Sequence, residues 1–596
     1  MAVAEHDRAA GNETLPRFAS LQSVLAEWSG GAKHVLVLGG GVAGLSAAHE
    51  LVARGYRVTV VERGSTVGGK ARSIAVEGSG TRGRPDLPGE HGFRFFPGFY
   101  RHLTDTMGRI AVDRAGRTAA DNLVAATMHR IAREGRKPVD FPTDFGSPVG
   151  TLSVPQALDF LIRELQRGGA GLTPQDIAAF VRRIVTMMTM CPARAEKELE
   201  ECSWWKFVEA EQHSEAYRKF FATALTKSLL AAKATEAAAR PAGLVLLQLI
   251  YSAVRSDSAV DRVLNGPTSA AWLDPWYAQL DGDGVHFMLK TTVLGFEMAD
   301  GRISGVRVQP TAGGAERTLT ADHYVAAVPA EVMATFLTRE LLAHAPSLAG
   351  VRQLGKDVDW MNGVLFFLDR PVPMVRGHVT YIDTEWSLTS ISQAQFWPGE
   401  MTRFGNGDCR EILSVCLSAW NCRSSVLGQT ARQSTYQQIV DEVWRQIKVA
   451  VNVEKRVVLD DTMLVRPGWI DTDIVFDTTP ARNLEPLLVN KAGRWAIRPD
   501  AHTAIPNFFL ASDYVRSHTN LATMEGANEA ARRAVNAILA RDGRAPDVKV
   551  WPLFVPASVA FLQAIDCVAH GRGAPWTPAF RGTEFEALAP LWERAP

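Results

Sequence analysis

The chain has 596 residues, of which 46% are hydrophobic and 21% are charged, as in an ordinary globular protein. This length exceeds what one hydrophobic core supports, so we expect two or three interleaved domains. Lysine plus arginine and aspartate plus glutamate both number 64. The balance argues against nucleic acid as a partner, because phosphate binding needs a clustered basic surface.

Neither the cysteines nor the N-terminal segment indicates export or a metal. The six cysteines form no C-x-x-C pair and none stands at zinc-ligand spacing with histidines, so we expect free thiols, a reducing compartment and no metal site. Residues 1–30 lack the apolar core of a signal peptide. No stretch approaches the roughly 20 apolar residues of a transmembrane helix. We therefore expect a cytoplasmic protein, and contact with a membrane surface stays open.

The first predicted elements form a strand–turn–helix–strand unit. Residues 34–38 are a short apolar, β-branched run typical of a buried strand. Glycines follow, then a helix with apolar residues at helical spacing that ends at Gly55. Residues 56–62 form the second strand. This order is the βαβ unit of a parallel sheet and predicts a Rossmann-like α/β fold.

The rest of the chain alternates between loops, helical segments and strands. The expected elements, in chain order, are an exposed loop at 77–89, mostly helices from about 100 to 250, a small β-meander over 284–328, strands within 364–370 and 410–420, a strand at 508–511 and a helix from Met524 to Leu539.

The turn after the first strand carries the pattern G-x-G-x-x-G. Gly39 permits the tight turn, Gly41 lets the backbone approach a pyrophosphate, and Gly44 permits close packing of helix on strand. Val42 and Ala43 begin the helix, whose free N–H groups and positive dipole end favour an anion. The turn therefore predicts a bound dinucleotide.

Glu62 ends the second strand of this unit. An acid at that place accepts hydrogen bonds from ribose hydroxyls and would repel a 2′-phosphate. The residues that follow resemble the extended fingerprint of the flavin amine oxidase superfamily, in which an acid–Arg pair, here Glu62–Arg63, precedes Gly-Gly-Lys or Gly-Gly-Arg. The resemblance implies FAD as the cofactor, with Gly69, Lys70 and Ala71 near its pyrophosphate and flavin.

The far end of the chain supplies the partner segment. Residues 509–514 and 522–527 resemble the superfamily's closing motif "LAGD … EGA", with Ser512 in place of the usual glycine. We expect that change to shift a loop contact without loss of binding. The resemblance implies that Asp513 bonds the pyrophosphate–ribitol region. It also implies that the helix start, at Met524, Glu525 and Ala527, faces the flavin pyrimidine, where a positive helix end stabilises reduced flavin.

Three further segments resemble the phytoene desaturase branch of that superfamily, which includes hydroxysqualene dehydroxylase and carotene isomerase-like proteins. They are residues 90–100, 265–280 and 321–329, which resemble "ETGLH-FFGAY", "GNPPERL-P" and "GDAYVFAAP". The resemblance runs from about residue 34 to 540, whereas 77–89 and 396–425 have no counterpart. It implies that Gly92 and Phe93 contact the cofactor and that backbone near Val293 holds the adenine.

The candidate catalytic residues lie within the segment 90–100. Arg94 takes the place of a histidine in the related enzymes, and it is expected to position substrate or stabilise charge because arginine stays protonated. His91 is the candidate proton carrier. Glu90 is an alternative. An ordinary structural role for Arg94 or His91 stays open.

Together these features predict an FAD-dependent oxidoreductase that desaturates an isoprenoid, carotenoid-like or other apolar carbon chain by hydride transfer to flavin N5. The expected electron acceptor is a quinone or oxygen. Three alternatives stay open: an amine oxidase acting on a C–N bond, a flavin-dependent isomerase or dehydroxylase of an isoprenoid, and a non-catalytic lipid-binding module.

The expected architecture is α/β, with a Rossmann-like FAD-binding domain interleaved with a substrate domain of mixed sheet and helices. The expected boundaries are an N-terminal extension at 1–33, FAD-binding segments at 34–100, 266–335 (with the β-meander) and 491–545, a mainly helical substrate or lid region at 101–265, a mixed-sheet substrate domain at 336–490, and a C-terminal tail at 546–596.

Overall fold

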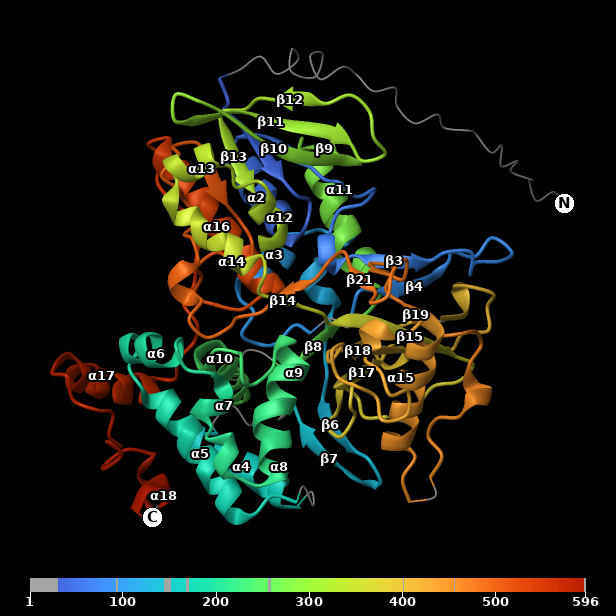
Figure 1. Ribbon diagram of the computed structural model, residues 1–596, viewed down its shortest axis with the longest axis vertical. Coiled ribbons are helices and arrows are strands. Elements are labelled where there is room, and N and C mark those ends of the chain that lie inside the picture. The colour runs from blue at the N-terminus through green and yellow to red at the C-terminus, as the bar shows by residue number, and fades with distance from the viewer. Residues whose placement is uncertain are drawn as a thin grey trace.

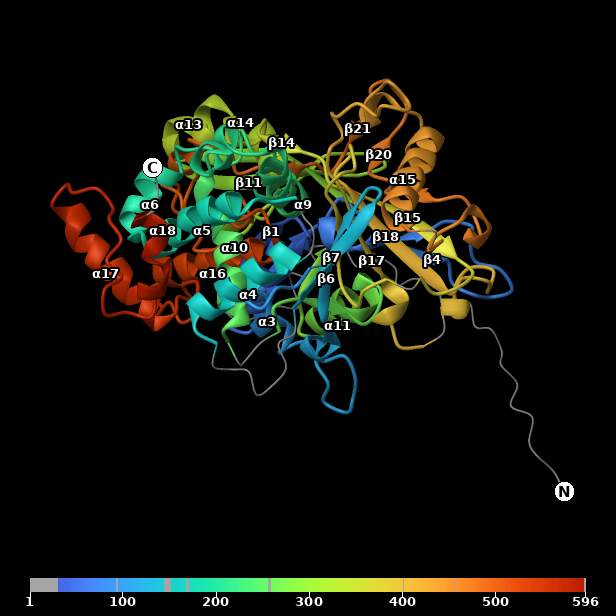
Figure 2. The same cartoon turned by 90° about the horizontal axis from the view of Figure 1, so that it is seen from below.

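The computed structural model describes residues 31–593 apart from 93–94, 144–151, 168–170, 256–258, 373, 400 and 455. Figure 1 shows a parallel sheet with flanking helices in the upper half, a helical region at lower left and a second large sheet at lower right. The turned view in Figure 2 shows the same helical region beside that second sheet.

Five parallel strands form the sheet that contains the first βαβ unit. Their order is β23-β13-β1-β2-β9, and every neighbouring pair is parallel. The strands are β1 (His34–Leu38), β2 (Arg57–Val61), β9 (His286–Met288), β13 (His323–Ala326) and β23 (Phe508–Leu510). All five residues of β1 are buried, as in a parallel strand covered on both faces. The predicted Rossmann-like α/β fold is confirmed.

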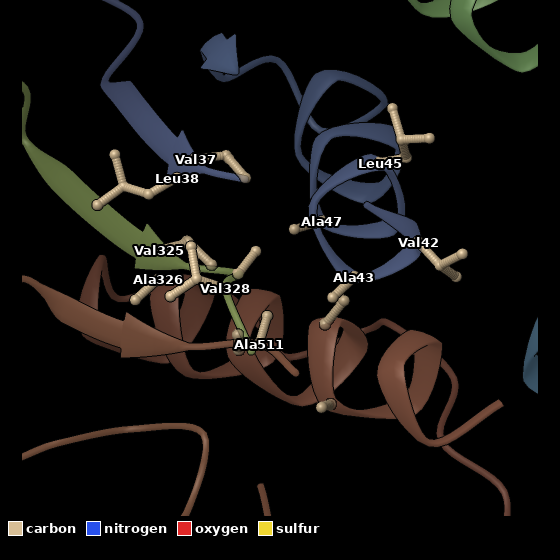
Figure 3. Packing of buried hydrophobic residues seen from close by; sticks show 14 of the residues in the cluster. Val37, Leu38, Val42, Ala43, Leu45, Ala47, Val325, Ala326, Val328 and Ala511 are labelled. Atoms are coloured by element: carbon tan, nitrogen blue, oxygen red, sulfur yellow. The ribbon is translucent and has the colours of Figure 1, made fainter. Parts of the chain in front are cut away.

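Two helices cross one face of this sheet. They are α2 (Val42–Val52) and α16 (Met524–Arg541), which the sequence predicts within a few residues. Figure 3 shows α2 beside the end of β1 and α16 below it, with Ala43 of α2 pointing toward α16. Small side chains at this contact bring both helix N-termini close to the carboxyl edge of the sheet.

The β-meander is smaller than the sequence predicts. Three antiparallel strands form it, β10 (Thr291–Ala299), β11 (Arg302–Pro310) and β12 (Arg317–Leu319). The flanking segments leave it and join the parallel sheet as β9 and β13. The chain turns at Lys290, which has a φ of +52°. Its N–H bonds the carbonyl of Gly64 at 2.8 Å, so pairing with the far-off β2 segment decides the break.

A seven-stranded sheet forms the second large layer. In order, its strands are β19 (Trp469–Ile470), β15 (Asn362–Leu368), β18 (Glu411–Leu417), β17 (Leu388–Ser392), β16 (Val379–Tyr381), β6 (Met128–Arg133) and β7 (Arg136–Pro142). Helix α15 (Tyr436–Val451) buries Ile439, Val443 and Ile447 against its outer face. The predicted strands within 364–370 and 410–420 are confirmed as β15 and β18. The inner face of the sheet points toward the rest of the molecule.

The region from about 100 to 250 is mostly helical, as the sequence predicts, although β6 and β7 extend the large sheet and β5 (Leu123–Ala125) pairs with β8 (Arg262–Leu264). One prediction about local structure is wrong. Residues 87–89 are not an exposed loop. They belong to β4 (Leu87–Glu90), which is buried and pairs with β3 (Ser73–Val76). Glycine and proline at 88–89 conceal a strand whose partner is supplied by another part of the chain.

The helical region comprises one set of consecutive helices and the C-terminal tail. The helices are α4 (Val154–Arg167), α5 (Pro174–Thr189), α6 (Pro192–Leu199), α7 (Trp204–Phe207), α8 (Glu215–Tyr217), α9 (Leu225–Leu230), α10 (Ala239–Ala253), α17 (Ala557–Gly571) and α18 (Pro590–Glu593). A buried ion pair of 3.0 Å between Arg194 and Asp566 ties α6 to α17. Within the described ranges, no helix combines the length and apolar composition needed to cross a bilayer.

Short elements complete the connections. They are α3 (His102–Met107), α11 (Asp274–Gly282), α12 (Ala330–Thr335), α13 (Arg339–His344), α14 (Val351–Leu354) and the two-stranded pairs β14 (Val358–Asp359) with β22 (Leu487–Leu488) and β20 (Ile474–Val475) with β21 (Arg482–Asn483).

Candidate active site

The carboxyl ends of β1, β2, β13 and β23 meet at one edge of the parallel sheet, where open α/β folds bind ligands. The turn after β1 crosses this edge. Gly39 has a φ of +106°, and a Cβ on it would lie 2.6 Å from the carbonyl oxygen of Ala327. A Cβ on Gly44 would lie 1.8 Å from the carbonyl oxygen of Gly39. Both glycines are therefore required by the fold itself.

Gly41 differs from these two glycines, because the protein leaves space around it. A Cβ there would come no closer than 3.8 Å, to Cα of Gly69. The second Gly-Gly turn lies beside the first, since the N–H of Gly68 donates to the carbonyl of Gly40 at 2.8 Å. Two bare backbone turns thus meet at the N-terminus of α2, where Val42 and Ala43 begin the helix. This arrangement suits a pyrophosphate.

Glu62 is held at the end of β2 by two backbone groups. Its carboxylate accepts hydrogen bonds of 2.7 Å from the N–H groups of Gly40 and Gly64. The carbonyl of Glu62 accepts from the N–H of Thr291 at 2.9 Å. Val293 follows two residues later in β10. The residues expected to hold ribose and adenine therefore lie at the same end of the sheet.

Both cations of the second turn are ion-paired. Arg63, about half exposed, pairs with Glu485, and Lys70 contacts the carbonyl of Pro486. Lys70 also lies 3.3 Å from the carboxylate of Glu331, at the start of α12. Burial raises the pKa of Glu331, and the nearby Lys70 charge opposes that shift. Lys70 and Ala71 form the short turn that follows Gly69.

The start of α16 lies at the same edge. Thr523 caps the helix by accepting from the N–H of Gly526 at 3.2 Å, and the N–H of Ala527 donates to the Thr523 carbonyl at 2.9 Å. Met524 opens the first turn. Asp513 follows β23 with its side chain half-buried, and the Ser512 hydroxyl lies 3.3 Å from its carboxylate. The helix start and the acid thus lie at the same edge of the parallel sheet.

The Glu525 side chain has a different environment from the one that the resemblance implies. It is fully buried, and its carboxylate accepts from the backbone N–H groups of Arg101, His102 and Leu103 at 2.8–2.9 Å. Nδ1 of His102 lies 2.7 Å from the same carboxylate. The side chain therefore caps α3, and contact with a cofactor would fall to the backbone N–H. Sequence offers no signal for a cap supplied by residues so distant in the chain.

His91 lies in a hydrogen-bonded network at the end of β4. Its Nδ1 is 2.6 Å from the carboxylate of Asp471, which also accepts from the side-chain amide of Asn362 at 2.8 Å. Asp473 lies 3.7 Å from the same nitrogen and pairs with Arg72 at 3.0 Å. His91, Asp471 and Asp473 have the chemistry of metal ligands. Arg72 and Asn362 already supply positive charge and a donor to these carboxylates.

A small pocket adjoins this network. Its walls come from β4, β8 with the turn after it, and the end of β17, namely Glu90, Gly92, Val263, Leu264, Gly266, Thr268, Ile391, Gln393 and Trp397. The carboxylate of Glu90 accepts from the Ser73 hydroxyl at 2.8 Å and the Thr268 N–H at 2.9 Å. Phe93 and Arg94, predicted to lie near the flavin, are outside the described residues.

These residues fit FAD. The paired glycine turns leave bare backbone and open space at Gly41. The N-termini of α2 and α16 provide two positive helix ends at one edge, as an extended dinucleotide requires.

The sequence profile of the family described as flavin containing amine oxidoreductase matches residues 42–539. The chain belongs to this family. It is therefore an FAD-dependent oxidoreductase, and the predicted cofactor is confirmed.

The proteins to which this chain is similar include two with carotenoid-related names and one amine oxidase. The chain is 24% identical to carotenoid phi-ring synthase of Streptomyces griseus, over 87% of this chain and 90% of that protein. It is 23% identical to 15-cis-phytoene desaturase of Synechococcus elongatus, over 85% and 96%. A putrescine oxidase structure with bound putrescine superposes with a TM-score of 0.55 at 13% identity, covering 85% of this chain and 99% of that one. The resemblance to the phytoene desaturase branch is thus supported, and the structural likeness shows the shared fold.

Proposed function

We propose that this FAD-dependent oxidoreductase dehydrogenates an apolar carbon chain of the isoprenoid or carotenoid type. The apolar part of the pocket wall carries the proposal. Four of the nine lining residues, Val263, Leu264, Ile391 and Trp397, are apolar, beside the polar Glu90, Thr268 and Gln393. The acid of the pocket, Glu90, bonds neighbouring protein groups. The names of the two carotenoid-related proteins support the same substrate class.

In this proposal the protein mainly positions the chain and excludes water. The pocket is small, so in this proposal it takes the reacting carbons and not a complete long isoprenoid. Each buried CH₂ contributes roughly 0.8 kcal/mol, so the rest of the chain binds through apolar contacts along its length. Bound flavin supplies a two-electron acceptor for a hydride from carbon. Asp471 orients His91, which remains a candidate for proton transfer.

The proposal includes transient contact with a membrane, from which an apolar substrate is drawn and to which a quinone acceptor belongs. Helix α17 supports this part. Its outward side is apolar, with Phe561 58%, Ile565 38% and Val568 56% exposed. The acid of that helix, Asp566, is buried against Arg194. Oxygen is the alternative electron acceptor.

The test is anaerobic bleaching of the flavin by a substrate panel. The panel holds phytoene, squalene and hydroxysqualene in detergent beside putrescine and other amines. Bleaching by an isoprenoid alone supports the proposal. Bleaching by an amine alone would replace it with C–N oxidation on the same fold.

A matched pair of variants locates the substrate. Val263→Ala removes two methyl groups from the pocket wall, whereas Val426→Ala does so at a valine that is 60% exposed. We expect only the first variant to raise the substrate concentration for half-maximal bleaching, by about tenfold at most for the lost apolar contact. If the two variants behave alike, the substrate binds elsewhere than in this pocket.

A further inference from the structure

One polar side chain of the pocket wall is buried without a partner in the protein. Gln393 lines the pocket, and only 7% of its surface is exposed. Its side-chain amide makes no hydrogen bond with any residue that the structure describes. An amide that is withdrawn from water without a partner costs free energy, so native proteins pair nearly all such groups. The Gln393 amide therefore points to a ligand group that bonds it in the pocket.

The backbone on both sides of Gln393 is fixed. Gln393 directly follows β17 and stands two residues after Ile391, another wall residue. Side chains two positions apart share one face of a strand, so both reach the pocket. The buried carboxylate of Glu411, on the neighbouring strand β18 (Figure 1), accepts from the Ser392 hydroxyl at 2.5 Å and from the Ala394 N–H at 3.1 Å. These bonds hold Gln393 in place and leave its amide to the pocket.

The other polar wall residues are Glu90 and Thr268. The Glu90 carboxylate is engaged with the protein, since it accepts from the Ser73 hydroxyl and the Thr268 N–H. Thr268 is 2% exposed, and its hydroxyl, like the Gln393 amide, bonds no described residue. An amide and a hydroxyl thus remain for a ligand. Both are neutral, so they suit a neutral polar group, whereas a buried ammonium ion requires a charged partner.

We infer that the pocket binds a hydroxyl group of the substrate and that Gln393 selects for this group. The inference rests on the proposed function and deepens it, because it makes the substrate an isoprenoid chain with a hydroxyl on or beside the reacting carbons. An amide offers an acceptor oxygen and a donor NH₂ group, and a hydroxyl both donates and accepts, so the two groups satisfy each other. Thr268 supplies a second hydroxyl in the same pocket.

Selectivity follows from the group that a hydrocarbon leaves unpaired. A chain without a hydroxyl excludes water from the pocket and bonds nothing to the Gln393 amide. A site that is built to bond a substrate hydroxyl therefore rejects the analogue that lacks it more strongly than an apolar pocket rejects a missing methylene. For one neutral amide we expect the hydroxylated chain to be favoured by about 10- to 100-fold.

The experiment compares squalene with hydroxysqualene, which share a carbon skeleton, in anaerobic flavin bleaching by the holoprotein. The measurement is the ratio of the two bleaching rates at low substrate concentration. The unmodified protein should favour hydroxysqualene by about 10- to 100-fold. Gln393→Leu should retain FAD and lower this ratio by about tenfold or more, because squalene then leaves no amide unpaired. Gln437→Leu, at an exposed position of α15, is the control and should keep the ratio.

The outcomes separate this inference from the proposed function. If no isoprenoid bleaches the flavin, both are overturned. Equal rates for the two probes, or bleaching by hydrocarbons alone, leave the proposed function standing and overturn the hydroxyl site. An unchanged preference in Gln393→Leu overturns the assignment of Gln393, since a general loss of packing lowers both rates and not their ratio. If this variant loses its flavin, the unbranched Gln393→Met decides by the same ratio.

Discussion

The carboxylate of Glu525 lies 2.7 Å from Nδ1 of His102 and also accepts from three backbone N–H groups at the start of α3. The contact joins the start of α16, at the sheet edge where we expect the cofactor, to α3. The Glu525 carboxylate is buried away from water and accepts from four donors. If this carboxylate is lost, no water replaces it, and the donors stay unpaired.

Glu525→Gln should therefore lower stability. The amide keeps one acceptor oxygen but presents an NH₂ group to a backbone donor, which costs about 2 kcal/mol. The measurement is the urea midpoint of unfolding, with Glu340→Gln, at an exposed position of α13, as the control. Equal midpoints for the two variants would show that the cap contributes nothing. Retained FAD in the folded variant is expected, because the side chain faces α3.

Two glycines of the first turn should differ sharply on substitution. Gly44→Ala places a Cβ 1.8 Å from a carbonyl oxygen and should abolish folded protein. Gly41→Ala places a Cβ in open space, 3.8 Å from the nearest atom, where the pyrophosphate approaches. This variant should fold, and its affinity for FAD should fall by about tenfold or more. The checks are circular dichroism for folding and the 450-nm-region flavin absorbance for binding. A yellow Gly41→Ala protein with full FAD content would refute the placement of the pyrophosphate.

A contact can be predicted from the sequence when the residues that form it lie close together in the chain. The turn from Gly39 to Gly44 is predictable because its demands lie within one βαβ unit. The break of the meander at Lys290 is not, because it depends on pairing with Gly64. The same holds for the hydrogen-bonded pair His378–Asp261, whose members directly precede two separate strands, β16 and β8, and form no motif. Sequence thus predicted the turn and the helix starts that meet at the sheet edge, whereas the buried polar pairs depend on long-range register.

Stability should fall in mild acid because of a buried histidine. The side chain of His49 is buried, and Nδ1 accepts a hydrogen bond of 3.2 Å from the indole N–H of Trp276, which the protonated ring could not do. Burial, followed by the charge of Arg109, lowers the pKa of His49 from 6.5 to about 4. Between these values the unfolded chain binds the proton and the native protein does not. The stability present above pH 6.5 is therefore lost as the pH falls toward 4.

His49→Gln should flatten this fall, because glutamine has no titrating group in the range. The measurement is the urea midpoint of unfolding at several pH values from 7.5 to 4.5, in the same buffers for every variant. The exposed His502→Gln should follow the unmodified protein. If the urea midpoint of His49→Gln falls with pH in parallel with that of the unmodified protein, His49 is not the cause of the acid sensitivity.

The apolar side of α17 should mediate membrane contact. Its exposed residues are Ala557, Ala560, Phe561, Ala564, Ile565, Cys567 and Val568. Basic residues flank the helix, with Lys549 before it and Arg572 after it, both exposed. An apolar face between cations is the pattern of an interfacial helix on an anionic membrane.

Phe561→Glu places a charge in the centre of that side and should reduce sedimentation with anionic vesicles by about tenfold, because both apolar burial and electrostatic attraction weaken. Val426→Glu, at an exposed valine far along the chain, is the matched control and should sediment as the unmodified protein does. Neutral vesicles should bind less than anionic ones, since the flanking cations contribute. Sedimentation that is unaffected by Phe561→Glu would place the membrane contact on another surface, whereas a concentration-dependent dimer that Phe561→Glu dissociates would assign this side of α17 to a second copy of the chain.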